Sequence, residues 1–242
     1  MAPENDEMSF LDHLEELRWR VLKSIIAIVV FAIPCGIFWK KIFDIVMVYP
    51  LRMSDPQPVL IYTSPAEPII LSIKIAVAGG LIISSPFVFY QIWRFVSPGL
   101  YKNEKVLVLP TVIASSIFFI LGILFSYMTV PFVISFLLKF AEGKLDAFYR
   151  AQEYLGFLLK LAIAFGVVFE LPVVSFVLTR IGIITPKFLI KNFRYAIVLI
   201  FILAAVLTPP DVISQLFLAA PLFVLYGISI LVSVFVIRRK SD

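Results

Sequence analysis

Residues 155–178 read LGFLLKLAIAFGVVFELPVVSFVL and contain only two charged side chains, Lys160 and Glu170. A helix of this length extends for about 36 Å at the usual rise per residue. That length is enough to cross about 30 Å of hydrocarbon. Because a span must satisfy its backbone hydrogen bonds internally, we predict that this stretch is a transmembrane helix.

Five more apolar runs accompany it. They are residues 21–38, 69–96, 106–138, 195–207 and 212–237. The chain is 61% hydrophobic, above the roughly 45–50% apolar share of a soluble domain. The alternation over about ten residues that marks the strands of a membrane barrel is absent. We therefore predict an all-α membrane protein in which residues 1–242 form one six-helix domain.

The lengths of the runs and of their connections differ. Residues 106–138 are too long for a perpendicular crossing, so we expect this span to tilt, to bend near Pro110 or Pro131, or to extend beyond the membrane. Residues 195–207 reach only about 20 Å. We predict short fifth and sixth spans that are antiparallel neighbours, because residues 208–211 leave room only for a tight turn.

Residues 40–68 form the main loop between the first two spans, and they contain five prolines. Proline at this density favours a stiff cap, although a simple linker remains the alternative. On the side of the N-terminus, loops and ends carry about twice as many Lys and Arg as on the other side, which predicts cytoplasmic termini. The formal net charge of +5 is therefore interpreted as a topology signal and not as a sign of nucleic-acid binding.

The polar and acidic N-terminal segment is unlike a cleavable signal peptide, so we expect none. Cys35 is the single cysteine, so a disulfide within the chain is excluded. Because His13 is the single histidine, we expect no metal site, and we also expect no cofactor. Residues 9–20 place apolar side chains at helical spacing, which predicts a short amphipathic helix on the cytoplasmic surface. An anchor leading into the first span is one interpretation, but its acidic cluster suits a cationic protein ligand.

Four separated segments resemble signature segments of the TatC family, the multispanning core of the twin-arginine protein translocase. They are HLEELRWR (13–20), FVSPGLYKNEK (95–105), FGVVFELPVV (165–174) and TPPDVISQLFLAAPLFVLY (208–226). The resemblance implies a protein of the bacterial inner membrane that recognises signal peptides with paired arginines. It also implies a multimeric assembly with single-span TatA/TatB-type subunits, which exports folded proteins by means of the proton-motive force.

Glu16 and Glu104 match the acidic recognition positions of the family. Arginine binds carboxylate through a planar fork, so adjacent arginines call for carboxylates on one rigid surface. Internal pairing with Arg18, Lys102 or Arg94 is the competing interpretation, and exposed pairs of this kind contribute about 0–1 kcal/mol. The remaining candidates for the peptide-binding surface are Glu15, Arg18, Phe95, Pro98, Leu100 and Lys102.

Glu170 lies near the middle of its span, where a carboxylate costs about 2.5–3.5 kcal/mol to insert. It therefore needs a partner, and the candidates are Lys74, Lys160, Gln215, Ser84 and Ser85. The resemblance implies that a polar residue of a single-span partner meets Glu170, whereas a buried structural carboxyl is the other interpretation.

Pro172 is expected to loosen the backbone bonding near Glu170 and to bend the fourth span. Asp211 and Gln215 are expected to cap the last helix or to hydrogen-bond across the bundle.

Two other classes of function were weighed. An ion-coupled solute transporter would use intramembrane charges such as Lys74, Lys160 and Glu170, but the two halves of the chain show no repeat. An intramembrane enzyme would need a catalytic pair within the spans, whereas His13 precedes them and no HExxH motif is present. We therefore predict that the protein is not an enzyme.

Overall fold

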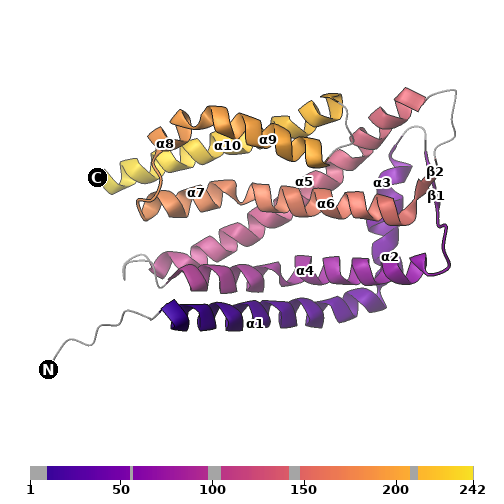
Figure 1. Ribbon diagram of the computed structural model, residues 1–242, viewed down its shortest axis with the longest axis horizontal. Helices are drawn as coiled ribbons and strands as arrows, with labels where there is room; N and C mark the ends of the chain where they lie inside the picture. Colours follow the sequence, from indigo (N-terminus) through magenta and orange to yellow (C-terminus); the bar gives the residue numbers. More distant parts are fainter. Residues whose placement is uncertain (1–9, 55–56, 98–104, 142–147, 208–211, 242) are drawn as a thin grey trace.

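The computed structural model describes residues 10–54, 57–97, 105–141, 148–207 and 212–241. Most of these residues are helical (Figure 1). The α-helices are α1 (Phe10–Ile37), α2 (Trp39–Phe43), α3 (Tyr49–Arg52), α4 (Glu67–Val96), α5 (Val108–Ala141), α6 (Ala151–Phe169), α7 (Leu171–Arg180), α8 (Pro186–Lys191), α9 (Phe193–Leu207) and α10 (Val212–Ser241). The remaining elements are a π-helical turn η1 (Asp44–Val48), a 3-10 turn η3 (Lys105–Leu107) and the strands β1 (Val59–Ile61) and β2 (Phe148–Arg150).

Within the described residues, five helical segments are long and apolar enough to cross a membrane. They are Asp12–Ile37, Glu67–Val96, Val108–Lys139, Ala151–Arg180 and Val212–Arg238. A shorter apolar helix, α9, has 15 residues and extends for about 22 Å. The predicted all-α membrane architecture is confirmed.

The first apolar run and the segment before it form one helix. The sequence predicts a separate amphipathic helix over residues 9–20, but α1 continues through it for 28 residues without a break. Neither Gly nor Pro interrupts the chain between Arg20 and Pro34, so nothing in the sequence stops the helix there. The polar segment is therefore a rigid extension of the first span.

The last helix differs from its prediction too. A short sixth span is wrong, because α10 has 30 residues and its apolar window continues to Arg238. The predicted pairing with the preceding helix is confirmed, since α9 and α10 run side by side in opposite directions (Figure 1). The Gln215 side chain of α10 donates a hydrogen bond to the Phe201 carbonyl of α9 at 3.0 Å.

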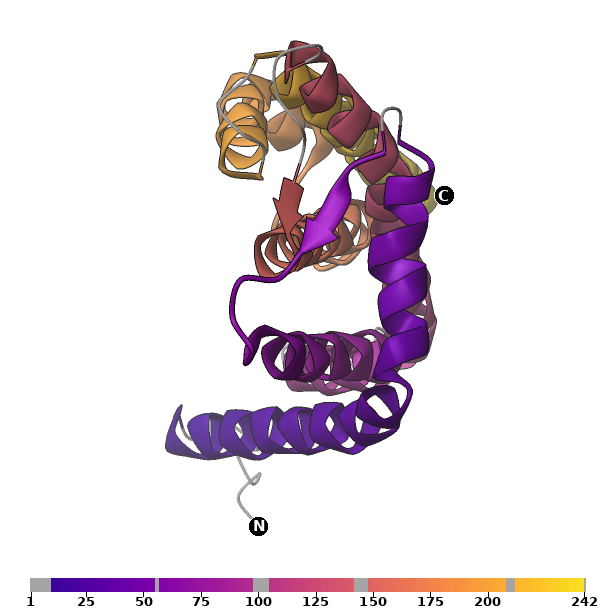
Figure 2. The same cartoon turned by 90° about the vertical axis from the view of Figure 1, so that its right-hand side faces the viewer.

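The long helices lie in layers. The helix α1 packs along α4, and α5 passes obliquely behind α6 (Figure 1). This oblique course accommodates the 34 residues of α5, which remains continuous through Pro131. The start of α1 and the end of α10 lie at one end of the molecule, called the terminus end here. The strands and α3 lie at the opposite end, the cap end (Figures 1 and 2).

The proline-rich segment after α1 is ordered where the structure describes it, and it forms α2, η1, α3 and β1. It is therefore a cap and not a simple linker. Strand β1 pairs in parallel with β2, so that Leu60 lies opposite Tyr149 (Figure 2). The Tyr127 hydroxyl of α5 donates a hydrogen bond to the Ile45 carbonyl at 2.6 Å and fixes the cap to the bundle.

An ion pair between a buried carboxylate and a partly exposed arginine closes the cap. Glu67 is only 2% exposed at the start of α4, and its Oε2 accepts a hydrogen bond from the Thr63 backbone N–H at 2.5 Å. Arg150, at the end of β2, places Nη2 at 3.5 Å from Glu67 Oε1 and also donates to the Thr63 hydroxyl at 3.0 Å. One carboxylate thus joins two segments that are far apart in the sequence.

Helices α5 and α6 approach each other closely at Gly122. A Cβ atom at Gly122 would lie 2.5 Å from the Phe165 carbonyl oxygen, a separation that real side chains do not show. Small residues at helix crossings allow this close approach in membranes. Around the crossing, Leu155, Leu161 and Phe165 are almost completely buried, so this is the core of the bundle.

Replacing Gly122 by Ala should destabilise the protein by about 1–3 kcal/mol, because the new methyl group has to push the two backbones apart. Unfolding in detergent, followed by circular dichroism, measures the loss. Gly156→Ala in α6 is the control, because a Cβ atom there has no described atom within 4 Å. That change should stabilise the helix by about 0.5–1 kcal/mol. Equal effects of the two substitutions would contradict this account of the crossing.

Candidate functional site

The first polar cluster lies at the terminus end, where α1 meets the end of α4. Glu16 and Arg20 are one turn apart on α1, a spacing that brings their side chains together. Arg20 Nε donates to Glu16 Oε1 at 2.9 Å, and Arg20 Nη2 binds the same oxygen. The guanidinium therefore fixes the orientation of the carboxylate.

Two contacts connect this pair to α4. Arg20 Nη1 lies 3.4 Å from the side-chain oxygen of Gln91, which is buried. One turn before Glu16, the His13 ring stacks on the Phe95 ring with centroids 4.3 Å apart and an angle of 17° between the planes. His13, Glu16, Arg20, Gln91 and Phe95 are called the α1/α4 site below.

The second carboxylate oxygen of Glu16, Oε2, does not accept a hydrogen bond from Arg20. Glu16 Oε2 is buried and has no hydrogen-bond partner among the described residues, and His13 Nδ1 lies 3.8 Å from it. A carboxylate oxygen that is withdrawn from water and lacks a donor is costly. The α1/α4 site can therefore accept hydrogen bonds from an incoming cationic group.

The structure places only some of the residues that were predicted for the peptide-binding surface near Glu16. It brings Phe95 close to Glu16 through His13, whereas Glu15 and Arg18 are exposed. Arg94 donates to the Tyr90 hydroxyl at 2.8 Å instead of pairing with Glu16. The other residues predicted for this surface, Pro98, Leu100, Lys102 and Glu104, lie outside the described residues, and so does Asp211, the predicted cap of the last helix.

Sequence reasoning missed three residues of the α1/α4 site, and one of them is His13, which was considered only as a possible metal ligand or catalytic residue. Arg20 follows Glu16 by four residues, and this spacing is a visible signal for an ion pair on a helix. Gln91 is 71 residues away from Arg20, and no local pattern indicates their contact.

Glu170 belongs to a second polar cluster, at a break in the fourth apolar run. It stands between α6 and α7, and Pro172 follows in the first turn of α7. Because proline has no N–H group to donate, the helical bonding is interrupted there, as predicted from the sequence. Glu170 is 8% exposed.

A tryptophan and a serine from two other helices meet Glu170. The Trp93 indole of α4 donates to the Ser115 hydroxyl of α5 at 2.9 Å, and the Ser115 side chain lies beside the Glu170 carboxyl. In the described part of the chain, Glu170 Oε1 has no hydrogen-bond partner. The break between α6 and α7 is thereby tied to α4 and α5, and one acceptor oxygen remains unused.

Three of the five partners that the sequence suggests for Glu170 are bound elsewhere, and neither Lys74 nor Lys160 forms an ion pair with it among the described residues. Gln215 donates to the Phe201 carbonyl, and Ser84 and Ser85 donate to carbonyls of their own helix at 3.3 and 2.8 Å. Serine hydroxyls in helices can bind the backbone one turn earlier, and this local bonding competes with contacts between helices. A serine does lie beside Glu170, as the sequence suggests, but it is Ser115 of α5 and not Ser84 or Ser85 of α4.

Both clusters lie within a region that matches a known family. The sequence profile described as "Sec-independent protein translocase protein (TatC)" matches residues 12–221. The chain belongs to the TatC family. It is therefore a component of a Sec-independent protein translocase, and the resemblance of the four segments is confirmed.

Individual members of the TatC family are similar over nearly the whole chain. A Sec-independent protein translocase protein TatC from Helicobacter pylori is 44% identical over 95% of this chain and 90% of its own length. Its counterpart from Aquifex aeolicus is 42% identical over 97% of this chain and 98% of its own. These relatives make the chain a multi-span membrane protein of a bacterial translocase.

Solved structures of the TatC family have the same fold. A crystal structure described as "Twin Arginine Translocase Receptor- TatC" superposes with a TM-score of 0.82. It is 40% identical to this chain and covers 93% of it, with 99% of the solved chain matched. A second crystal structure, of the receptor in the detergent DDM, gives a TM-score of 0.83.

Replacing Ser115 by Ala should cost about 1–3 kcal/mol, because the buried Trp93 N–H loses its acceptor and the Glu170 carboxyl loses its neighbouring hydroxyl group. Thermal unfolding in detergent measures the difference. Ser116→Ala is the matched control, since the Ser116 hydroxyl donates only to the Val112 carbonyl of its own helix at 2.8 Å. This control should cost less than about 0.5 kcal/mol. If both variants have the unfolding temperature of the wild-type protein, Ser115 does not stabilise the cluster around Glu170.

Proposed function

We propose that this chain is the signal-peptide receptor and core subunit of a twin-arginine translocase, and that paired arginines bind at the α1/α4 site. The observation that carries the proposal is the buried Glu16 Oε2, which has no hydrogen-bond donor among the described residues. The similar crystal structure that is described as a twin-arginine translocase receptor supports it.

The chemistry of the α1/α4 site suits a guanidinium. Arg20 holds Glu16 Oε1, so the carboxylate has a fixed orientation before any ligand arrives. A planar guanidinium can donate to Glu16 Oε2 once the ligand displaces the atoms that cover this buried oxygen. Lysine offers one compact charge without this fork, so it should bind less well.

A second arginine needs a second acceptor. We assign this role to Glu104, which follows α4 in the sequence and matches the acidic position of the family. The Phe95 ring is part of the α1/α4 site and offers apolar surface to residues beside the arginines. In this proposal Pro98 and Leu100 extend that surface, while Glu15, Arg18 and Lys102 set the charge around it.

This function requires the terminus end to face the cytoplasm. The excess of basic residues in the segments on that side supports this orientation. The start of α1 and the end of α10 lie at the same end of the molecule (Figure 1). An even number of membrane crossings, such as six, returns the chain to the side on which it began. In this proposal α9 is the fifth of the six crossings, and the bilayer thins locally to match its length of about 22 Å.

Glu170 is proposed as the contact for single-span partners of the TatA/TatB type. Its unused oxygen lies at the break between α6 and α7, where it could meet a polar side chain from a neighbouring helix. Assembly of these partners around the receptor would then form the route for folded proteins, and the proton-motive force would supply the energy.

Replacing Glu16 by Gln should weaken the binding of a twin-arginine signal peptide by about tenfold, because a hydrogen bond to a charged group contributes about 1.5–3 kcal/mol. A titration of the purified protein in detergent measures this change. Wild-type protein should also prefer the peptide over its twin-lysine counterpart, and Glu16→Gln should reduce that preference.

Glu15→Gln is the comparison, since it removes the same charge from an exposed position next to Glu16. It should weaken binding by less than about twofold. Equal losses in both variants, or equal affinity of the two peptides for wild-type protein, would indicate a general acidic surface and not a guanidinium site.

Replacing Glu170 by Leu should reduce the amount of a single-span partner that co-purifies with the protein. Glu170→Gln should reduce it less, because the amide keeps hydrogen-bonding atoms at the same place. Quantitative blotting of the purified complexes measures the ratio. If both variants retain the wild-type amount of partner, Glu170 is a structural carboxyl.

A further inference from the structure

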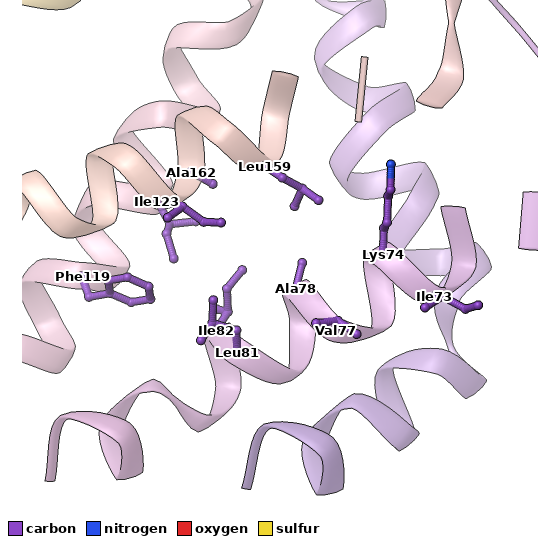
Figure 3. Close-up of a pocket in the computed structure, with 11 residues that line it drawn as sticks. Ile73, Lys74, Val77, Ala78, Leu81, Ile82, Phe119, Ile123, Leu159 and Ala162 are labelled. Carbon is purple, nitrogen blue, oxygen red and sulfur yellow. The ribbon is translucent and has the colours of Figure 1, made fainter. Parts of the chain in front are cut away.

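An apolar cavity of about 290 Å³ lies between α4, α5 and α6, away from both polar clusters (Figure 3). Its α4 wall extends from Ile73 to Ile82, and the facing side chains include Phe119 and Ile123 of α5 and Leu159 and Ala162 of α6. Ile73 and Val77 are more than half exposed at its rim. A cavity with such walls does not hold ordered water, so it suits an apolar occupant.

Lys74 is the one charged residue that lines the cavity, and it stands near the cap end (Figure 3). No hydrogen bond or ion pair joins Lys74 to any described residue. The nearby acid Glu67 is engaged by Arg150 and by the Thr63 backbone. The lysine therefore offers a positive charge that the described protein does not neutralise.

The depth of Lys74 matches the level of lipid headgroups. It lies seven residues after the start of α4, about 10 Å along a helix that is about 45 Å long. If α4 is centred in hydrocarbon about 30 Å thick, Lys74 lies just inside the boundary of the leaflet at the cap end. A lysine stem is long enough to carry its ammonium group back to that boundary.

The cavity is too small to enclose a helix. An α-helix with its side chains is about 10 Å across and occupies roughly 1,100 Å³ over the ~14 Å from Ile73 to Ile82, whereas all the empty space there is about 750 Å³ even when open solvent is counted. The volume of about 290 Å³ is instead suited to a single extended hydrocarbon chain. The charge stands near one end of the apolar wall, which is the arrangement of polar and apolar parts in a phospholipid.

We propose that this cavity binds one phospholipid of the leaflet at the cap end, with an acyl chain along the α4 wall and its phosphate at Lys74. The proposed orientation of the protein makes this the outer leaflet. The site is independent of the α1/α4 site, so a failure of one assignment does not affect the other.

Native mass spectrometry of delipidated protein in detergent tests this site with two lipids of identical chains, phosphatidylglycerol and diacylglycerol. Wild-type protein should bind phosphatidylglycerol about fivefold more tightly, the factor expected for one lysine near an anionic headgroup. Lys74→Met should remove this preference. Lys160→Met, which changes a lysine of α6 that does not line the cavity, should retain it.

Filling the cavity provides an independent measurement. Ala78→Phe and Ala162→Phe, from α4 and α6, should each lower the binding of both lipids, because the chain loses its space. Melting temperatures identify whichever of the two variants remains folded. An unchanged preference in Lys74→Met, or unchanged lipid binding in a folded filled variant, would overturn the proposal. The proposal would also be overturned if the filled variant no longer bound a 20-residue apolar helical peptide but still bound phosphatidylglycerol as tightly as the wild-type protein does.

Discussion

The hydrocarbon of a bilayer offers no water, so each polar group within it must find a partner inside the protein. Most polar side chains of the long helices meet this constraint. Thr179 and Ser233 share a hydrogen bond at 2.8 Å between α7 and α10, and the Tyr226 hydroxyl donates to the Leu189 carbonyl at 2.9 Å. Buried atoms without a hydrogen-bond partner among the described residues also include Glu67 Oε1 and the Tyr154 hydroxyl, so the binding sites proposed at Glu16, Glu170 and Lys74 depend on their surroundings as well.

These three positions lie on different helices and at different depths. Glu16 is near the terminus end, Glu170 is at the break between α6 and α7, and Lys74 is near the cap end. The three ligands proposed above, a signal peptide, a partner helix and a lipid, would therefore bind at separate surfaces of one chain. The shared requirement is a rigid scaffold, which the close crossing at Gly122 and the ion pair of Glu67 provide.

Hydropathy predicted the helical architecture because each long span needs an apolar run of its own, and Pro172 predicted the break beside Glu170 because its effect is local. The continuity of α1 and the full length of α10 were misjudged, since polar residues can extend a helix beyond the hydrocarbon. The partner of Glu170 was not predictable. Ser115 looks like the other serines in the sequence, and only tertiary packing places it beside Trp93 and Glu170.

The pair formed by Arg20 and Glu16 has a consequence for how tightly any cargo can be held. In the proposed function the chain carries its own counterion, because Arg20 neutralises part of the negative charge of Glu16 before a ligand arrives. An arriving guanidinium adds to an existing ion pair and does not meet a bare carboxylate, which moderates the gain in energy. Such a contact can distinguish between signal peptides and still release them quickly, as a translocase that exports many cargo proteins in turn requires.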